Sequence, residues 1–110
     1  CGGNRGLLSV GRVQRQMGVR KVREAAKWYR KSGEQGLAAA EFALGAMYAN
    51  GDGVIQDNVY AHMWFNIAAS SGHKNAVTNR DIAAKNMMAA DISKAQGLAR
   101  ACVAKKYKGC

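Results

Sequence analysis

The feature that most constrains the fold of this 110-residue chain is an internal repeat, in which residues 24–36 recur in altered form at residues 60–72. A fixed period of this size is typical of stacked helical repeats, because a single helix pair cannot bury its apolar face alone. We therefore predict an all-α fold, a short right-handed α-solenoid of about five helices built from helix–turn–helix repeats. The pairs that keep the common offset of 36 are Ala25 with Ala61, Trp28 with Trp64, Tyr29 with Phe65, Gly36 with Gly72, and Ala40 with Ala76.

Apolar residues at spacings of three and four mark each expected helix, since such residues share one face of an α-helix. In the first helix, the stripe expected to be buried includes Val22, Ala25, Trp28 and Tyr29. The glycine-rich segment before it keeps neither helical nor strand periodicity, which predicts an irregular, weakly ordered arm. The expected helices are 20–35, 37–49, 58–71, 74–88 and 90–106. The resulting division is an arm (1–19) and a repeat domain (20–110), which comprises the second helix of a partial repeat (20–36), a complete repeat (37–72), and a C-terminal helix pair and tail (73–110).

The two helices of the complete repeat are joined by a loop whose residues suit a turn and a helix cap. Gly51 and Gly53 can take positive φ at low cost, and Asp57 is a good N-cap for the helix that follows. Gly45 lies inside the preceding helix, where glycine costs about 1 kcal/mol relative to alanine. Such a glycine usually has a packing reason, so we expect a neighbouring helix to approach closely at Gly45.

These residues, in this order, resemble the repeat of the Sel1-like family, a branch of the tetratricopeptide-type helical solenoids. The resemblance covers about residues 21–110, where the chain is similar to the C-terminal part of a bacterial member, and fails for residues 1–20. That failure, with the absence of an initiating methionine, suggests a truncated or altered N-terminus. The resemblance implies a non-catalytic scaffold that holds other proteins and needs no cofactor. The family pattern is met by Ala40, Leu44, Gly45, Tyr48, Gly51, Gly53, Val54, Asp57, Ala61, Trp64, Phe65, Ala68, Ala69 and Gly72, with Trp28 in the partial repeat.

Partner binding in such a fold is expected on a concave face lined by the first helices of successive repeats. The candidates are side chains left over once the core is filled. The alternative for each is ordinary solvent exposure or, for Phe42, a partial role in the core. The candidate partner-binding residues are Glu41, Phe42 and Ala49 from the complete repeat, and Thr78, which matches Phe42 in phase.

The formal net charge of +10 is unevenly distributed. Residues 1–31 carry nine Lys or Arg against one acid, residues 32–72 carry four acids and no Lys or Arg, and residues 73–110 carry eight Lys or Arg against two acids. Basic flanks of this kind permit an alternative function, the binding of nucleic acid or an anionic membrane. The competing interpretation is a solvated basic helix face beside a basic arm. Core packing explains the paired aromatic residues with fewer assumptions than base stacking does, so nucleic acid is the less favoured partner.

The N-terminal edge of the repeat domain is a candidate for weak self-association. A preceding helix covers this edge in an intact solenoid, and terminal repeats normally need a polar outer face. Here the edge would carry Val22, Ala25 and Trp28. We expect an association through this apolar area to persist at high salt.

Cysteine and histidine offer little chemistry in this chain. Cys1, Cys102 and Cys110 include no CxxC pair, and no acid is placed to complete a nucleophilic triad with His62 or His73, which we expect at the surface. Cys102 and Cys110 pair only if the tail folds back and the protein is exported; otherwise Cys102 is a small buried hydrophobe. A periplasmic or secreted location is slightly favoured over a cytoplasmic one. Cys1, followed by two glycines, resembles the lipidated cysteine at the mature N-terminus of a bacterial lipoprotein. A fragment boundary that falls on cysteine by chance is the simpler account. We expect the chain to attach to a membrane only if Cys1 is lipidated.

Overall fold

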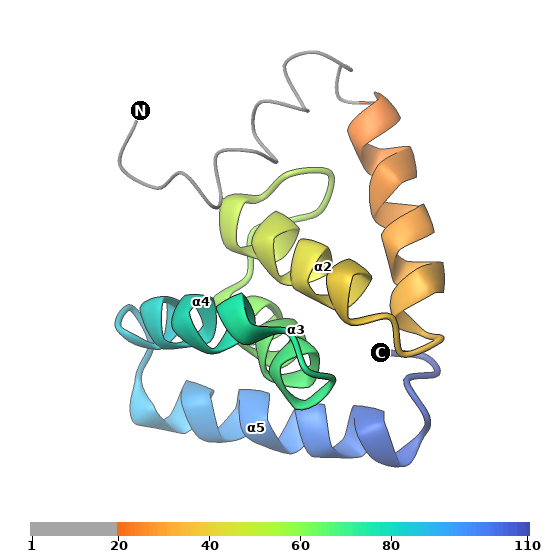
Figure 1. Cartoon of the computed structure of the whole chain (residues 1–110). Helices are drawn as coiled ribbons and strands as arrows, with labels where there is room; N and C mark the ends of the chain where they lie inside the picture. Colours follow the sequence, from red (N-terminus) through yellow and green to blue (C-terminus); the bar gives the residue numbers. More distant parts are fainter. Residues whose placement is uncertain (1–19) are drawn as a thin grey trace.

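A computed structural model describes residues 20–110 of the chain, and within this range the fold is all-α, with helices and no strand (Figure 1). The first described helix covers residues 20–33 and is called here the 20–33 helix. The helices that follow are α2 (Ala38–Asn50), α3 (Asn58–Ser70), α4 (Lys74–Ala84) and α5 (Ala89–Ala104). The predicted arm, 1–19, lies outside the described residues.

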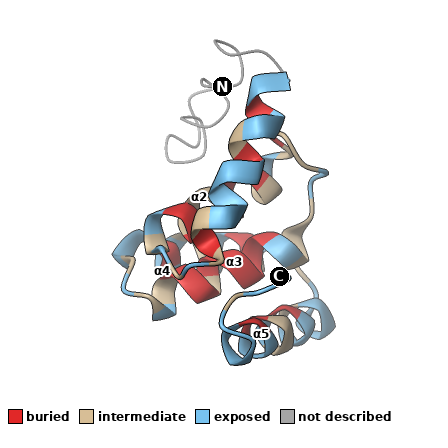
Figure 2. Ribbon diagram, turned by 90° about the vertical axis from the view of Figure 1, so that its right-hand side faces the viewer, coloured by how far each residue is buried: buried red, intermediate tan, exposed pale blue. Residues whose placement is uncertain are grey.

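Helix α3 is the centre of the stack, because it contacts α2, α4 and α5. The 20–33 helix lies beside α2 (Figure 1), where Val22 and Ala26 pack against Met47. The main core cluster joins α2, α3 and α5 through Leu44, Met63, Trp64, Ile67, Ala99 and Cys102. Figure 2 shows the buried residues concentrated along α2 and α3, while the outer sides of α5 and the 20–33 helix are exposed.

Close contact between α2 and α3 depends on Gly45. A Cβ atom at this position would lie 2.5 Å from Cδ1 of Phe65, far inside van der Waals distance. The loop after α2 begins at Gly51, which has a φ of 73° and ends the helix in the left-handed conformation. Asp57 then caps α3, since its Oδ1 accepts hydrogen bonds from the backbone N–H groups of Val59 (2.9 Å) and Tyr60 (3.1 Å).

The predicted burial of Trp28 is wrong, because 68% of this side chain is exposed, whereas Trp64 at the equivalent repeat position is fully buried. Tyr29 is also exposed. The 20–33 helix makes its contacts through Val22, Ala26 and Gly33, so the buried stripe is rotated away from Trp28. Helix α3 has neighbours on several sides, but the described neighbours of the 20–33 helix lie on one side only. Trp28 and Trp64 therefore occupy equivalent positions of the repeat but differ in burial.

Helix lengths also differ from the expected ones. Helix α4 ends at Ala84, four residues before the predicted end at residue 88, because the chain turns there to bring α5 back against α3. Ala83 of α4 is buried, while Ile82 is 40% exposed. Helix α5 begins at Ala89 and ends at Ala104, close to the predicted 90–106. None of the described helices is both long enough and apolar enough to cross a membrane.

The last residues, 105–110, fold back onto the molecule, and we call them the C-terminal clasp. A disulfide joins Cys102 to Cys110. The ring of Tyr107 lies over Gly36, with Cε2 3.1 Å from the point where a Cβ of that glycine would stand. The Gly109 N–H donates a 3.2 Å hydrogen bond to Oε2 of Glu34. Figure 1 accordingly shows the C-terminus beside the turn between the 20–33 helix and α2. The clasp thus connects the last described helix to the first.

Candidate functional site

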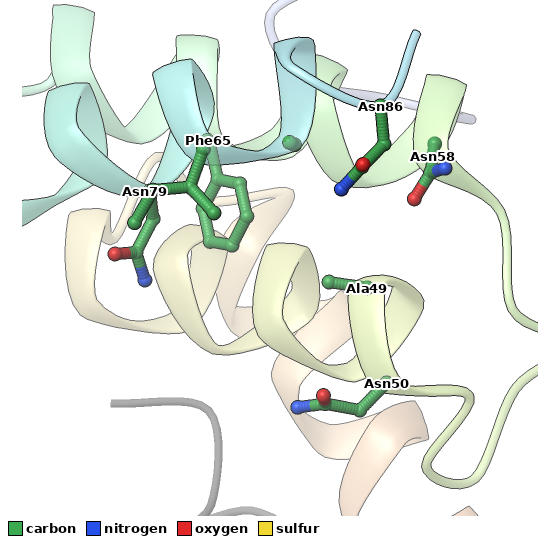
Figure 3. Close-up of a pocket in the computed structure, with 8 residues that line it drawn as sticks. Ala49, Asn50, Asn58, Phe65, Asn79 and Asn86 are labelled. Atoms are coloured by element: carbon green, nitrogen blue, oxygen red, sulfur yellow. The ribbon is translucent and has the colours of Figure 1, made fainter. Parts of the chain in front are cut away.

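The candidate site is a hollow of about 250 Å³ between α2 of the complete repeat and α4 of the helix pair that follows it (Figure 3). Its apolar part is formed by Phe65 of α3 and by Ile82 of α4. In the view of Figure 3, the Phe65 ring lies between Asn79 and Asn86 on the α4 side, and Ala49 and Asn50 lie on the α2 side. The residues that line the hollow are Ala49, Asn50, Asn58, Phe65, Asn79, Ile82, Ala83 and Asn86.

The wall on the α4 side follows from helical spacing. Asn79, Ile82, Ala83 and Asn86 are spaced i, i+3, i+4 and i+7, which places them along one stripe of α4 and the turn after it. The opposite wall repeats one of them, because Asn50 precedes Asn86 by the repeat length of 36 residues. The hollow therefore lies where the complete repeat meets the C-terminal helix pair.

The asparagine side chains give the hollow its polar character. Asn58 accepts a 2.8 Å hydrogen bond from Nε2 of Gln56. Within residues 20–110, the carboxamides of Asn79 and Asn86 make no hydrogen bond, so their donors and acceptors face the hollow uncommitted. Among residues 20–110, no Lys, Arg, Asp, Glu or His lines this hollow. Its described polar groups can exchange hydrogen bonds with a polar ligand.

Two of the predicted partner-binding residues lie near this surface in different ways. Ala49 lines the hollow. Phe42 is half-buried, with its ring stacked on His73 at 4.2 Å and tilted against Phe65 at 5.6 Å, which makes it partly a core residue. Thr78 is exposed on α4 but does not line the hollow. The sequence interpretation did not include the asparagines, although the offset of 36 between Asn50 and Asn86 is a signal that could have found them.

The prediction that Glu41 faces a partner is wrong, because its exposed fraction is 0%. Helix α2 packs against both the 20–33 helix and α3, so residues on more than one side of α2 are buried. The side chain of Glu41 lies beside Gly33, together with Leu44 and Trp64. Within residues 20–110, neither carboxyl oxygen of Glu41 has a hydrogen-bond partner. Burial raises the pKa of Glu41 above its ordinary value of 4.5, and the nearby Ser71 side chain offsets part of this rise.

Replacing Glu41 by glutamine is expected to stabilise the fold increasingly as the pH rises. The raised folded-state pKa means that the folded carboxyl holds its proton at a pH where the unfolded one has lost it. The free energy of unfolding of the wild-type protein therefore falls as the pH rises from about 4.5, the ordinary pKa of the carboxyl, through the higher pKa of the folded state. Urea unfolding of wild type and Glu41→Gln across this range gives the difference between their free energies of unfolding, which should widen as the pH rises. Glu24→Gln, which removes an exposed carboxyl from the adjacent helix, measures the effect of net charge alone. A Glu41→Gln difference that stays constant with pH would contradict the burial of a charged group.

His62 is a second correction, because it is buried although the sequence interpretation placed it on the surface. Helix α4 covers that side of α3. Burial lowers the pKa of His62, the positive charge of Arg80 lowers it further, and Asp81 acts in the opposite direction. The imidazole is thus neutral near pH 7. Within residues 20–110, no group of three or more His, Cys, Asp or Glu side chains is arranged to hold a metal ion.

A separate surface, which we call the basic helix face, is the exposed side of the 20–33 helix. Trp28 stands on it, with Nζ of Lys31 5.1 Å from the ring centroid. The predicted self-association edge is wrong for Val22, which is buried, while Ala25 is half-buried. Only Trp28 of those three residues is exposed, so the edge is less apolar than expected. The exposed cations of this face are Arg20, Lys21, Arg23, Lys27, Arg30 and Lys31.

Comparison with known proteins agrees with this architecture. The model of the Sel1 repeat matches the chain twice, at residues 10–37 and 38–73. The second match coincides with the complete repeat that contains α2 and α3. The first match begins at residue 10, so the prediction that the resemblance fails for residues 1–20 is wrong for residues 10–20. No curated protein matches the chain. Because the two matches together cover more than half of the chain, this protein belongs to the Sel1 repeat family.

Proposed function

We propose that the chain is a non-catalytic scaffold that binds a segment of another protein at the surface formed by α2 and α4. The observation that carries the proposal is the hollow between α2 and α4, where the carboxamides of Asn79 and Asn86 make no hydrogen bond within residues 20–110. Concave sites of this composition are the usual places for ligands on folded proteins. The family is typically a protein-interaction scaffold, which supports the same assignment.

The chemistry of the lining residues supports a binding role over a catalytic one. Catalysis by side chains requires a nucleophile, an acid or a base with a suitable pKa at the site. The residues of the hollow that belong to the described range are asparagine, alanine, isoleucine and phenylalanine, none of which titrates. The buried groups whose pKa is perturbed among the described residues, Glu41, Asp52 and His62, do not line it.

The disulfide between Cys102 and Cys110 supports an oxidising compartment for this scaffold. Disulfides persist in the periplasm and outside the cell, whereas cytosolic thiols are kept reduced. We therefore assign the protein to an exported location, with partners among other exported proteins.

Selection of peptides tests the scaffold proposal. Peptides selected from a random phage-displayed library on the oxidised protein should bind it in solution, and Ala49→Arg should abolish their binding because it fills the hollow with a long charged side chain. Thr78→Arg adds the same charge to the exposed face of α4 outside the hollow and is the matched control. Equal binding by the two variants would place the peptides elsewhere, and a library that yields no binder would overturn the proposal.

A second candidate is the binding of an anionic membrane surface by the basic helix face. The specific observation is that Trp28 is exposed among the cations of that helix, an arrangement found at membrane interfaces. Vesicles with anionic phospholipids distinguish the two candidates. Binding to them should fall away near 1 M salt, where the screening length is about 3 Å, and should be unaffected by Ala49→Arg.

A further inference from the structure

We propose that the disulfide-closed clasp extends the basic helix face into a larger cationic surface, and that an anionic phospholipid membrane binds this surface more tightly when the disulfide is present. This inference rests on the second candidate function given above. It adds to that function a second group of binding residues and a dependence on the disulfide. The added residues are the exposed lysines of the clasp, Lys105, Lys106 and Lys108.

The clasp places its lysines beside the end of the 20–33 helix. Lys108 directly precedes Gly109, whose N–H donates the 3.2 Å hydrogen bond to Oε2 of Glu34. On the other side of this contact, Lys31 lies three residues before Glu34, in the last turn of the helix. The helix and the clasp both lie on the right-hand side of Figure 1, which is the side that faces the viewer in Figure 2. The fold therefore brings together two basic segments that are far apart in the sequence.

The cations of the clasp are available to an external anion. Within residues 20–110, the ammonium groups of Lys105, Lys106 and Lys108 make no hydrogen bond or ion pair. Glu34, the acid at the contact, accepts the N–H of Gly109. The 20–33 helix itself carries one acid, the exposed Glu24, against its six exposed cations. The described part of the combined surface is therefore strongly positive, and it is complementary to an anionic partner.

Trp28 favours a membrane as that partner. This side chain is 68% exposed on the same helix, and tryptophan is enriched at the headgroup level of bilayers. Stacking of a nucleic-acid base would need a free ring face, but Nζ of Lys31 lies over the Trp28 ring, 5.1 Å from its centroid. A bilayer also presents anionic groups over a wide area, so it can meet the helix and the clasp at the same time.

The disulfide matters because it holds the clasp lysines in place before any ligand arrives. A side chain that is already ordered loses less entropy on binding than one on a mobile tail. The screening length is about 8 Å at physiological ionic strength, so a lysine contributes little while it is farther than this from the bilayer. In the absence of the bond between Cys102 and Cys110, the lysines at the end of the clasp should therefore contribute less to binding.

The test is cosedimentation with vesicles of phosphatidylglycerol and phosphatidylcholine at physiological salt. A lysine near an anionic bilayer contributes about fivefold to affinity, so Lys106→Gln/Lys108→Gln should weaken binding by the oxidised protein about twentyfold. Lys85→Gln/Lys94→Gln is the matched control, because it removes the same charge from exposed positions toward the opposite end of α5. Since those positions are distant from the surface, the control should weaken binding by less than about threefold.

Cys110→Ser tests the dependence on the disulfide, and Cys1→Ser, which keeps the bond, is its control. Cys110→Ser should weaken vesicle binding by about fivefold or more, whereas Cys1→Ser should bind like the wild type. Adding Lys106→Gln/Lys108→Gln to Cys110→Ser should then have a smaller effect than the same pair has in the oxidised wild type. Circular dichroism shows whether each variant keeps its helices.

The outcomes separate this inference from the function on which it rests. Equal losses for the two double-lysine variants, or equal affinities of oxidised wild type and Cys110→Ser, would overturn the inference and leave membrane binding by the basic helix face standing. If oxidised wild type does not bind the vesicles at all, both are overturned. Binding to a single-stranded oligonucleotide without binding to vesicles would assign the surface to nucleic acid and would also overturn both.

Discussion

Replacing Trp64 by alanine is expected to lower the free energy of unfolding by about 3–5 kcal/mol, the usual cost of deleting a buried aromatic side chain. Trp64 is fully buried and belongs to the cluster that joins α2, α3 and α5. Its removal therefore weakens several helix contacts at once. A domain of this size has a total stability of only about 5–15 kcal/mol, so the variant should melt at a much lower temperature than wild type.

The repeat supplies its own control in Trp28, which has the same side chain at the equivalent position. Because Trp28 is exposed, Trp28→Ala should change the free energy of unfolding by less than about 0.5 kcal/mol. Urea unfolding followed by circular dichroism measures both variants. Similar losses for the two tryptophans would mean that the two helices are buried alike, contrary to the packing described above.

Loss of the disulfide is the second large effect expected. The bond closes a short loop, with a sequence separation of 8, for which the restriction of the unfolded chain contributes about 2–3 kcal/mol. Lys106 and Tyr107 have φ values of 55° and 67°, in the left-handed region that non-glycine residues rarely adopt. Without the covalent link, these residues have less to hold them there, and the clasp should detach from Gly36 and Glu34.

Cys110→Ser, compared with oxidised wild type by urea unfolding, measures this contribution. The variant should be less stable by about that amount, and the NMR signals of residues 105–110 should move toward those of an unfolded chain. Reduction of wild type with a dithiol should reproduce the change. Cys1→Ser removes a cysteine outside the disulfide and should leave stability unaltered. An identical unfolding curve for oxidised and reduced wild type would contradict the structural role of the bond.

Features fixed by neighbouring residues were predictable from the sequence. Asp57 caps α3 through the backbone of its own first turn, so its role needs no knowledge of the rest of the fold. Gly45 indicates a close helix contact because a helix-interior glycine is otherwise unfavourable. The repeat period itself predicts a helical solenoid, as the family match shows.

Burial that depends on the number of neighbouring helices was not predictable in the same way. Glu41 and His62 are polar residues on helices that are covered on more than one side, and a single apolar stripe does not reveal the second contact. The prediction for Trp28 is wrong in the opposite direction, because this residue is exposed where burial was expected. The apolar pattern does not show that Val22 and Ala26, rather than Trp28, face the neighbouring helix. The asparagines of the hollow were overlooked because they are neither apolar nor ionisable, so neither periodicity nor charge marks them.

The C-terminal clasp also changes how the fold comes apart. In an ordinary solenoid each repeat contacts only its neighbours, so terminal helices can fray while the remainder stays folded. Here Gly109 and Glu34, 75 residues apart in the sequence, are hydrogen-bonded to each other. Helix α5 cannot separate from α3 unless the clasp also separates from the turn that follows the 20–33 helix. The clasp thus links the two ends of the described stack through a contact of long sequence separation, whose closure costs more chain entropy than a contact within one repeat.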